Sequence, residues 1–555
     1  MKFHTSKDGV GKGKANKSFI QAITRFFERG LFAPFLLSIQ PVLQLFLINV
    51  AELDFSEIIR SLFAALLFGV VVLGILYLFT RNWVKSSLVA SLFIILFFLF
   101  GDVADWIVKT FGLGPVRANF FILALVAVIM IVWFWVVRSR IKNTRSLNLY
   151  FNLLSVLFLI SSVIQMRNYL IENGVSLKRA ERPVQVAVVQ STNPRPDIYY
   201  IILDAYGRND VLQTIYDFDD SGFLNALRAK GFYIADGASS NYIQTMLSLS
   251  SSLNMNYIQS LKADGTDIEN RGDLISILEN SKVRNVLAQN GYKTVSFRNE
   301  YKATFPNADI YYDDSEKGLM YPVTAFESIL IDHTLARVLT VLPAFHKALI
   351  EMPYDTHRHY ILSSFSMLQE TPTLDGDYFI YAHIIAPHPP FVFDEKGVPL
   401  PHNEPFKLAD ANHFIKDHSR KAYITGYRQQ MQYINTLVLE TVDEILAKSK
   451  TPPVIIIQGD HGPGAYLHWG SLEKTLPGER FSILNAYYFP DQDYSRLYPS
   501  ISPINSFRVL LDKYFGGNYE LLPDRHYYSP WGYPFDFTEV KDVSLQTLKS
   551  QLEKK

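Results

Sequence analysis

The chain of 555 residues is too long for one compact domain, and with 48% hydrophobic and 19% charged residues it is too apolar for a disordered chain. Its 53 basic and 53 acidic residues give no net charge, which argues against nucleic-acid binding because no global field attracts phosphates. The absence of cysteine excludes disulfides, thiolate metal ligands and cysteine nucleophiles, so any metal must be held by oxygen and imidazole.

Five apolar runs near the N-terminus predict five membrane spans. Four are close to the roughly 20 residues that cross a bilayer core, and the third reaches that length by continuing past a Gly-Asp pair. A cleaved signal peptide is the alternative for the first run, but no small-residue cleavage site precedes Glu52 and more spans follow. The sequence predicts a transmembrane domain over 1–166, with spans at about 31–51, 58–79, 88–108, 118–137 and 147–166.

Basic residues indicate how the spans are oriented. The arm before the first span and the loops after the second and fourth spans are rich in Lys and Arg, whereas the intervening loops carry acids such as Glu52 and Asp102. The positive-inside rule therefore places the N-terminus in the cytoplasm. We expect an integral protein of the cell (inner) membrane. An odd number of spans then places everything after Met166 outside the cytoplasm.

The second half of the chain has the pattern of an α/β domain with a mainly parallel sheet. A polar, proline-containing linker over 167–196 precedes it, and a polar tail over 541–555 follows the expected domain, 197–540. Helical patterns, the clearest at 423–445, alternate with apolar runs typical of buried strands. These strands are expected at 198–203, 293–297, 378–385, 454–457 and 481–489.

Two predicted strands end in residues that can bind a metal. The first leads into Asp204, and the strand at 454–457 leads into Asp460-His461. Ligands of parallel sheets bind beyond the carboxyl ends of the strands. A turn or helix cap is the alternative role for either aspartate alone. The pair favours a shared cation, because uncompensated carboxylates beside a dry core are costly.

A polar turn precedes a helical pattern that begins at Thr245. The free N–H groups at a helix N-terminus favour an alkoxide or a bound phosphate, so Thr245 is a candidate nucleophile. The alternative role for this residue is a simple N-cap, and Ser248 is the alternative nucleophile.

In their order and spacing, these segments resemble the alkaline phosphatase and sulfatase superfamily from Asp197 to about Pro490. Five spans followed by an extracytoplasmic domain resemble its branch of lipoteichoic acid synthases and lipid A phosphoethanolamine transferases. The segments that carry the resemblance are Ile201–Asp204, Thr245–Leu249, Ala386–Phe391, Gly459–Gly462 and Tyr466–His468.

The resemblance implies a divalent metal site for zinc, manganese or magnesium, with Thr245 as nucleophile and the ligands Asp204, Thr245, Asp460 and His461. It also implies that His388 and His468 handle the transferred group or a second metal, and a histidine there could protonate a leaving alcohol. The sulfatase activation motif, Cys or Ser followed by x-Pro-x-Arg, is absent, which argues against a formylglycine sulfatase. The lack of cysteine also removes the disulfides of the phosphoethanolamine transferases.

Histidines are concentrated in one region, with eight of the 13 between residues 346 and 418. Only His388 lies directly beyond a predicted strand. We expect His383 to point into the sheet and most of the others to be solvated in polar loops, with His402 the best candidate among them for a substrate contact.

These observations predict a membrane-anchored, metal-dependent transferase. It would move a phospho-alcohol group from a phospholipid or lipid-linked donor to an envelope glycan or lipid through a covalent phospho-threonine. The anchor favours a lipid donor because it keeps the site near the bilayer. One alternative is a sulfatase-like hydrolase, a phosphodiesterase or sulfuric ester hydrolase, with the same site. The other is a non-catalytic membrane receptor, against which the intact ligand set argues.

Overall fold

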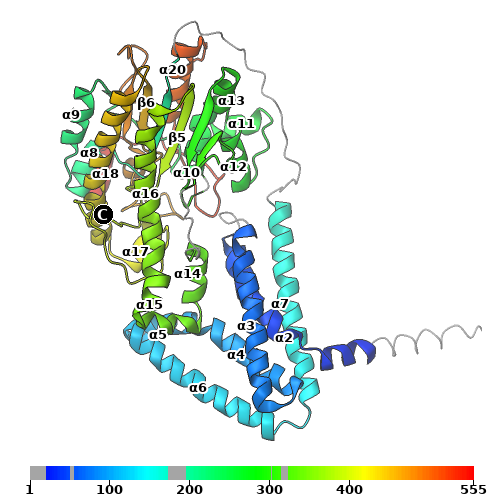
Figure 1. Cartoon of the computed structure of the whole chain (residues 1–555). Coiled ribbons are helices and arrows are strands. Elements are labelled where there is room, and N and C mark those ends of the chain that lie inside the picture. Colours follow the sequence, from blue (N-terminus) through cyan, green and yellow to red (C-terminus); the bar gives the residue numbers. More distant parts are fainter. Residues whose placement is uncertain (1–20, 50–54, 173–194, 302, 314–322, 555) are drawn as a thin grey trace, which may run out of the picture. The chain divides into compact units, whose positions relative to one another are not determined.

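The computed structural model describes the whole chain except residues 1–20, 50–54, 173–194, 302, 314–322 and 555 (Figure 1). The chain forms two compact units: a helical unit of residues 1–173 and 323–350, and an α/β unit of residues 174–322 and 351–555. The chain therefore passes between the units three times. The expected linker, 167–196, lies mostly outside the described residues, and the sequence did not lead us to expect that 323–350 joins the helical unit.

The helical unit contains three helices that are long and apolar enough to cross a bilayer, and up to five spans if each of two bent helix pairs counts as one. The three are α3 (Phe55–Thr80), α6 (Pro115–Ser139) and α7 (Thr144–Glu172). The bent pairs are Gln21–Arg29 with α2 (Phe32–Ile48), at 74°, and α4 (Trp83–Phe98) with α5 (Phe100–Phe111), at 45°. The run predicted as a third span is thus bent at Leu99 rather than one straight helix.

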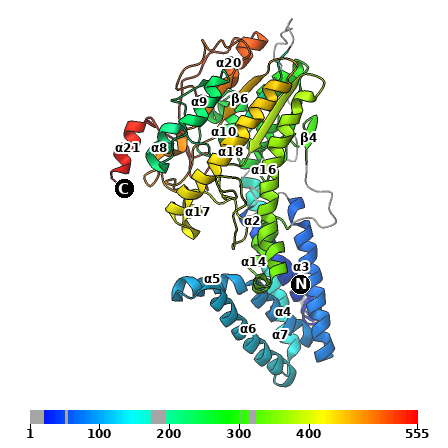
Figure 2. The ribbon, with the colours of Figure 1, turned by 60° about the vertical axis from the view of Figure 1, so that its left-hand side comes forward.

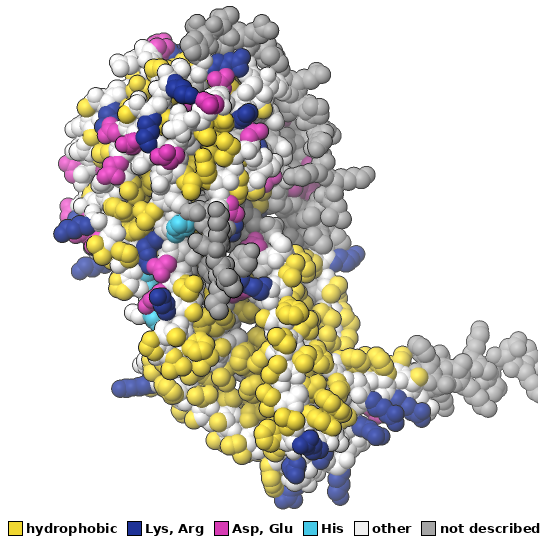
Figure 3. Space-filling model, viewed as in Figure 1, with side chains coloured by type: hydrophobic (Ala, Val, Ile, Leu, Met, Phe, Trp, Pro, Cys, Tyr) yellow, Lys and Arg dark blue, Asp and Glu magenta, His cyan; other side chains and the backbone are white. Residues whose placement is uncertain are grey.

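Basic residues gather at one end of the helical unit. Arg138, at the end of α6, donates to the carbonyl of Phe79 at 3.1 Å, and Lys85 at the start of α4 donates to the carbonyl of Arg138 at 2.9 Å. The two basic loops predicted to share a membrane side therefore lie together. Figure 3 shows Lys and Arg at this end and hydrophobic side chains over the surface between it and α5.

The sheet of the α/β unit has the order β2-β7-β6-β1-β5-β3-β4, and its centre is parallel, as predicted. Its parallel strands are β1 (Ile198–Leu203), β3 (Lys293–Phe297), β4 (Ile310–Tyr312), β5 (Tyr378–Ile384) and β6 (Val454–Gln458). Strands β7 (Asn485–Tyr488) and β2 (Tyr233–Ile234) pair antiparallel at the other edge. The strand expected at 481–489 begins only at Asn485, because the preceding residues form helix α19 (Pro477–Phe481).

Helices cover both faces of this sheet (Figures 1 and 2). One face carries α16 (Met352–Glu370) and α18 (Arg420–Lys448), and the other carries α10 (Thr245–Asn254), α12 (Arg271–Glu279), α13 (Lys282–Gln289) and α20 (Pro503–Phe515). Every residue of β1 is buried, which explains its unbroken apolar sequence. Shorter helices lie around these layers: α8 (Asn209–Tyr216), α9 (Ser221–Ala229), α11 (Ile258–Ala263) and α17 (Ala411–Asp417).

The C-terminal residues are not only a polar tail. Helix α21 (Leu545–Leu552) begins after Ser544, whose hydroxyl accepts from the backbone N–H of Thr547. Leu548 is buried against Val211 and Leu476 of the α/β unit. A short amphipathic helix thus packs where the sequence analysis expected solvated chain.

Candidate active site

The strand order places two carboxylates at one edge of the sheet. Asp204 follows β1 directly, and Asp460 follows β6, the parallel neighbour of β1. Ala205 has a left-handed backbone conformation, with φ of +64°, and its N–H donates to Oδ1 of Asp460 at 3.0 Å. This conformation is strained for a residue with a Cβ, so the turn holds the two aspartates together at a conformational cost.

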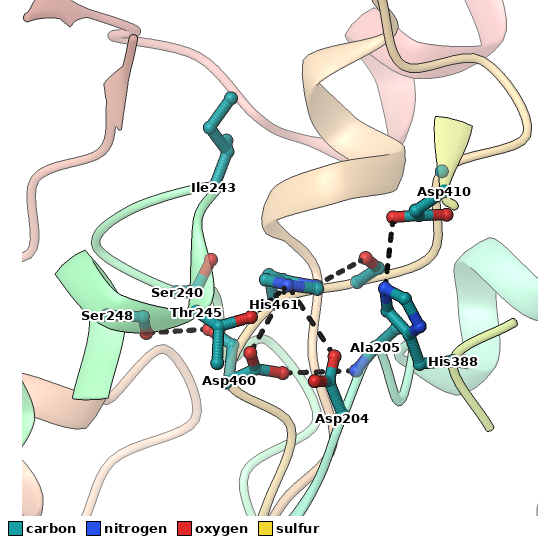
Figure 4. Close-up of polar contacts among 12 residues, drawn as sticks. Asp204, Ala205, Ser240, Ile243, Thr245, Ser248, His388, Asp410, Asp460 and His461 are labelled. Atoms are coloured by element: carbon teal, nitrogen blue, oxygen red, sulfur yellow. Dashed lines mark hydrogen bonds and ion pairs between the residues drawn. The ribbon is translucent and has the colours of Figure 1, made fainter. Parts of the chain in front are cut away.

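The four predicted metal ligands lie together, with Asp204, Thr245 and Asp460 around the imidazole nitrogen Nε2 of His461 (Figure 4). Nε2 of His461 lies 3.1 Å from Oγ1 of Thr245, 3.2 Å from Oδ2 of Asp460 and 3.6 Å from Oδ1 of Asp204. The side chains come from the ends of β1 and β6 and from the start of α10. The structure therefore brings together residues that are far apart in the sequence.

The donor set fits a divalent cation. Oδ1 of Asp204 and Oδ2 of Asp460 are buried and have no hydrogen-bond partner among the described residues. Two such oxygens are costly unless a positive ion satisfies them. Three oxygens and one imidazole nitrogen suit zinc, manganese or magnesium.

The tautomer of His461 also suits a ligand. Nδ1 of this residue lies 3.1 Å from the carbonyl of Gly462, which can only accept, so the proton is on Nδ1 and the lone pair of Nε2 faces the carboxylates. Burial, and next the charge of Arg480, lower the pKa of His461 and keep the ring neutral. Burial raises the pKa of Asp204, but the nearby histidines, His388 foremost, outweigh it and leave that pKa below its ordinary value.

His383 does not simply point into the sheet, and that expectation was wrong. Its Nε2 lies 3.1 Å from Oδ2 of Asp204, and Asp204, His383 and Asp460 offer ligand atoms that lie within 4.8 Å of one another. Asn299 donates to the carbonyl of His383 at 2.6 Å and helps to fix the residue. A signal was available, because His383 is the penultimate residue of β5, which is parallel to β1.

The structure separates the two candidate nucleophiles. Thr245 is the first residue of α10, and the N-cap is Gln244, so the hydroxyl of Thr245 is not used as a cap. The hydroxyl of Ser248 donates to the backbone carbonyl of Asp460 at 2.6 Å. Ser248 thus supports the metal-ligand turn, whereas Oγ1 of Thr245 faces His461.

The two predicted proton donors have different surroundings. His388 follows β5, its N–H donates to the carbonyl of Asp204 at 3.1 Å, and its Nε2 lies 3.9 Å from Oδ2 of Asp410. In His468 the ring nitrogen Nδ1 accepts from the N–H of Gly470 within the same turn. The structure brings His388 to the site, and in the described part of the chain no contact joins the ring of His468 to the four predicted ligands.

A buried ion pair beside the site escaped the sequence analysis. Arg480 is 1% exposed, and it donates to Oδ2 of Asp410 at 2.7 Å and to Nε2 of His461 at 3.0 Å. Burial raises the pKa of Asp410, but Arg480, His388 and the hydrogen bond from Tyr423 together outweigh it and lower that pKa to about 2. Neither residue ends a predicted strand, so no sequence pattern marked them. Asp410 thus orients the guanidinium of Arg480 beside Nε2 of His461, which Thr245 also faces, and a guanidinium is a group that binds phosphoryl oxygens.

Comparison with known proteins gives one family match. The family model described as Sulfatase matches residues 196–500 of the chain. No protein of curated function matches the chain in sequence.

Several solved structures are similar at low identity. The C-terminal periplasmic domain of EcEptC from Escherichia coli is 12% identical, with a TM-score of 0.41, covering 65% of this chain and 96% of that chain. The integral membrane lipooligosaccharide phosphoethanolamine transferase A of Neisseria meningitidis is 14% identical, with a TM-score of 0.40, covering 87% and 95%. The phosphonate monoester hydrolase of Agrobacterium radiobacter is 13% identical, with a TM-score of 0.35, covering 60% and 80%.

Proposed function

Because the chain belongs to the sulfatase family, we propose that it is a membrane-anchored, metal-dependent phosphotransferase that acts through a covalent phospho-Thr245. It takes a phospho-alcohol group from a phospholipid or lipid-linked donor and passes it to an envelope glycan or lipid. The observation that carries the proposal is the convergence of two orphaned carboxylate oxygens, an imidazole nitrogen and the Thr245 hydroxyl at one helix N-terminus.

The metal ligands are Asp204, Thr245, Asp460 and His461. A divalent ion bound there would lower the pKa of the threonine hydroxyl and would stabilise the negative charge on the phosphoryl oxygens. Ser248 holds the turn that carries Asp460, and His383 holds the second oxygen of Asp204.

The transfer has two balanced steps. In the first, Oγ1 of Thr245 forms a bond to phosphorus, and the bond from phosphorus to the oxygen of the lipid alcohol breaks. Thr245 reacts as the alkoxide, its hydroxyl proton having gone to solvent, and His388 starts the step protonated and gives its proton to the leaving oxygen, so that the second step returns both groups to these states. In the second step the acceptor hydroxyl forms its bond to phosphorus, the bond to Oγ1 breaks, and His388 takes the acceptor's proton. The guanidinium of Arg480 lies beside the position where the phosphoryl charge resides.

The helical unit supports a lipid donor, since its long apolar helices anchor the α/β unit to a bilayer. Its segregated basic loops support an N-terminus in the cytoplasm and an extracytoplasmic α/β unit, the orientation that we propose. An activated formylglycine is not part of the proposal. The positions two and four after Thr245 are Leu247 and Leu249, where the sulfatase activation motif requires Pro and Arg.

Mass spectrometry of the full chain in lipid nanodiscs tests the proposal. The purified protein is treated with phosphatidylglycerol or phosphatidylethanolamine carrying a labelled head group, and the adduct mass identifies the transferred group. We expect an adduct on Thr245 that Thr245→Ala abolishes, with a loss of turnover of about 10⁴-fold or more. The matched control Ser248→Ala should keep the adduct, because Ser248 contacts only the backbone of the site.

The outcomes separate the alternatives. Transfer of label to an added glycan or lipid acceptor supports the transferase. If free phospho-alcohol is released in the presence of every acceptor tested, the protein would be a hydrolase and not a transferase. A protein that binds no divalent metal and forms no adduct would be a receptor, and an adduct that moves to Ser248 would refute the assignment of the nucleophile.

A further inference from the structure

The segment 323–350 belongs to the helical unit although it lies inside the family match, between β4 and α16. It comprises α14 (Ala325–Asp332), the 3₁₀ helix η1 (Leu335–Val341) and α15 (Pro343–His346). No function in the proposed transfer requires it. Its position raises the question of what it contributes at the surface of the helical unit.

Two ion pairs and one histidine–aspartate contact attach one side of the segment to the helices of this unit. Arg60 of α3 binds Glu327, Asp102 of α5 lies 2.7 Å from Nδ1 of His333, and Asp105 of α5 lies 2.9 Å from Arg337. The N–H of Gly101 donates to the carbonyl of His333 at 2.9 Å. A side chain at Gly101 would collide with the backbone there, so the approach is close. His333 and Arg337 of the segment are thus paired with acids of α5, and Glu327 is paired with a base of α3.

Apolar side chains then bury its inner face. Leu335 and Val338 pack against a cluster of α5 and α6 residues that includes Phe100 and Ile122. Phe326 is 5% exposed and packs in a cluster with Ile58 and others of α2 and α3. The segment is therefore a fixed part of the helical unit.

Its outer face is apolar and exposed. Val341, Leu342 and Phe345 are 51%, 47% and 43% exposed, and on the neighbouring helix α5 the side chains of Trp106 and Phe111 are 59% and 64% exposed. Helix α5 runs across the direction of α6 in both ribbon views (Figures 1 and 2), and α15 lies at its level in Figure 1. These exposed side chains form a surface, the apolar plate, made of η1, α15 and α5.

The plate is continuous with a surface that faces lipid. Helix α6, a candidate span, starts four residues after α5 and exposes Val116, Phe120 and Phe121 by half or more. Figure 3 shows hydrophobic side chains continuing over this corner of the helical unit. Lys109 and Lys347 are exposed beside the aromatic residues, and Trp with Lys is the composition of membrane-water interfaces.

We propose that the apolar plate lies in the bilayer, at the boundary between head groups and acyl chains, on the membrane side opposite the basic loops. An amphipathic element with paired charges on one side and an aromatic and aliphatic face on the other binds in this way. A bilayer, rather than a protein, is the partner because the exposed face continues into the lipid-facing side of α6. The segment inserted in the α/β unit's sequence thus gives that unit a membrane anchor of its own.

Site-directed labelling tests the plate, and the chain suits it because it contains no cysteine. Leu342→Cys and Phe345→Cys are labelled with an environment-sensitive fluorophore in the full chain, in nanodiscs that hold one copy. Two matched sites are labelled as controls: Val128→Cys on α6, where the native side chain is 58% exposed, and Val398→Cys on the α/β unit, where it is 54% exposed. Because these side chains are exposed, the substitutions remove little packing.

Quenchers at known depths give the readout. We expect blue-shifted emission at 342 and 345, loss of quenching by aqueous iodide, and stronger quenching by doxyl groups near the glycerol backbone than by doxyl groups near the chain ends. Val128→Cys should show the opposite depth preference, and Val398→Cys should respond only to iodide. Iodide quenching at 342 and 345 equal to that at 398 would overturn the proposal. Protection from iodide without doxyl quenching would overturn it too, because a protein surface would then cover the plate.

Discussion

The variant Asp460→Asn should be less stable than the wild type when metal is bound and more stable than the wild type when metal is removed. In the wild type the carboxylates of Asp204 and Asp460 present ligand atoms within 4.8 Å of each other. Two negative charges at that distance repel by about 3 kcal/mol at the effective dielectric constant of protein sites, near 20. Without a cation this repulsion lowers the free energy of unfolding.

The variant Asp460→Asn keeps one contact and changes the other. Its amide oxygen can still accept from the N–H of Ala205, as Oδ1 of the aspartate does at 3.0 Å. Its NH₂ group replaces Oδ2 and can donate toward the orphaned Oδ1 of Asp204. We therefore expect the metal-free variant to be more stable than the metal-free wild type by about 1 to 3 kcal/mol.

Metal should restore the usual order. At a free metal concentration 100-fold above Kd, binding stabilises the wild type by about 2.7 kcal/mol, whereas the variant has lost a ligand and gains much less. The assay is thermal unfolding of the purified full chain with chelator, zinc, manganese or magnesium, followed by circular dichroism. The control is Asp220→Asn, a buried carboxylate away from His461, which should leave the metal response unchanged. Equal destabilisation of Asp460→Asn with and without metal would refute the shared site.

Three further predictions follow from the same structure. Burial raises the pKa of Asp220 to about 7, although Tyr206 and Asn435 donate hydrogen bonds to it. The folded protein therefore keeps a proton that the unfolded chain releases. The free energy of unfolding falls by up to about 4 kcal/mol as the pH rises from about 4 to 7. In Asp220→Asn, unfolding measured at pH 5 and pH 8 should lack that fall, and a fall of the wild-type size would contradict the assignment. His383→Ala should lower metal affinity by about 10- to 100-fold in a competition titration, because the imidazole holds the second oxygen of Asp204, and an unchanged affinity would leave His383 without a role. A reporter fused after Lys555 should be active only outside the cytoplasm, and cytoplasmic activity would show that the proposed orientation is wrong.

The core of the fold could be predicted from the sequence because buried parallel strands have a plain signature. The runs at 198–203 and 293–297 match β1 and β3 residue for residue, since both are short and rich in β-branched or aromatic residues. Strand ends are equally local features, so Asp204 and Asp460 could be placed at one edge of the sheet, whereas Thr245 was placed at a helix N-terminus and joined to them by the family resemblance. Their convergence on His461 agrees with that placement, although their roles in catalysis stay predictions.

The parts that could not be predicted depend on contacts between distant segments. Arg480 and Asp410 lie in a short helix and a loop, and only the packing of those elements places the pair against His461. The bend at Leu99 accompanies a hydrogen bond from Gly101 to His333, a residue far along the chain. His383 was misjudged for a different reason, because the sequence does not show that this residue lies near the end of β5, where its ring reaches Asp204.

The three passages of the chain between the two units have a consequence for proteolysis and for truncation. A single cut in the first passage leaves residues 323–350 joined to the α/β unit by the chain on both sides and packed against helices of the other fragment. Even a fragment that starts at Asp197 still carries Phe326, Leu335 and Val338, whose partners lie in the removed helices. After one cut the α/β unit is therefore still held to the helical fragment by the packing of residues 323–350, and a soluble form would have to lose these residues as well.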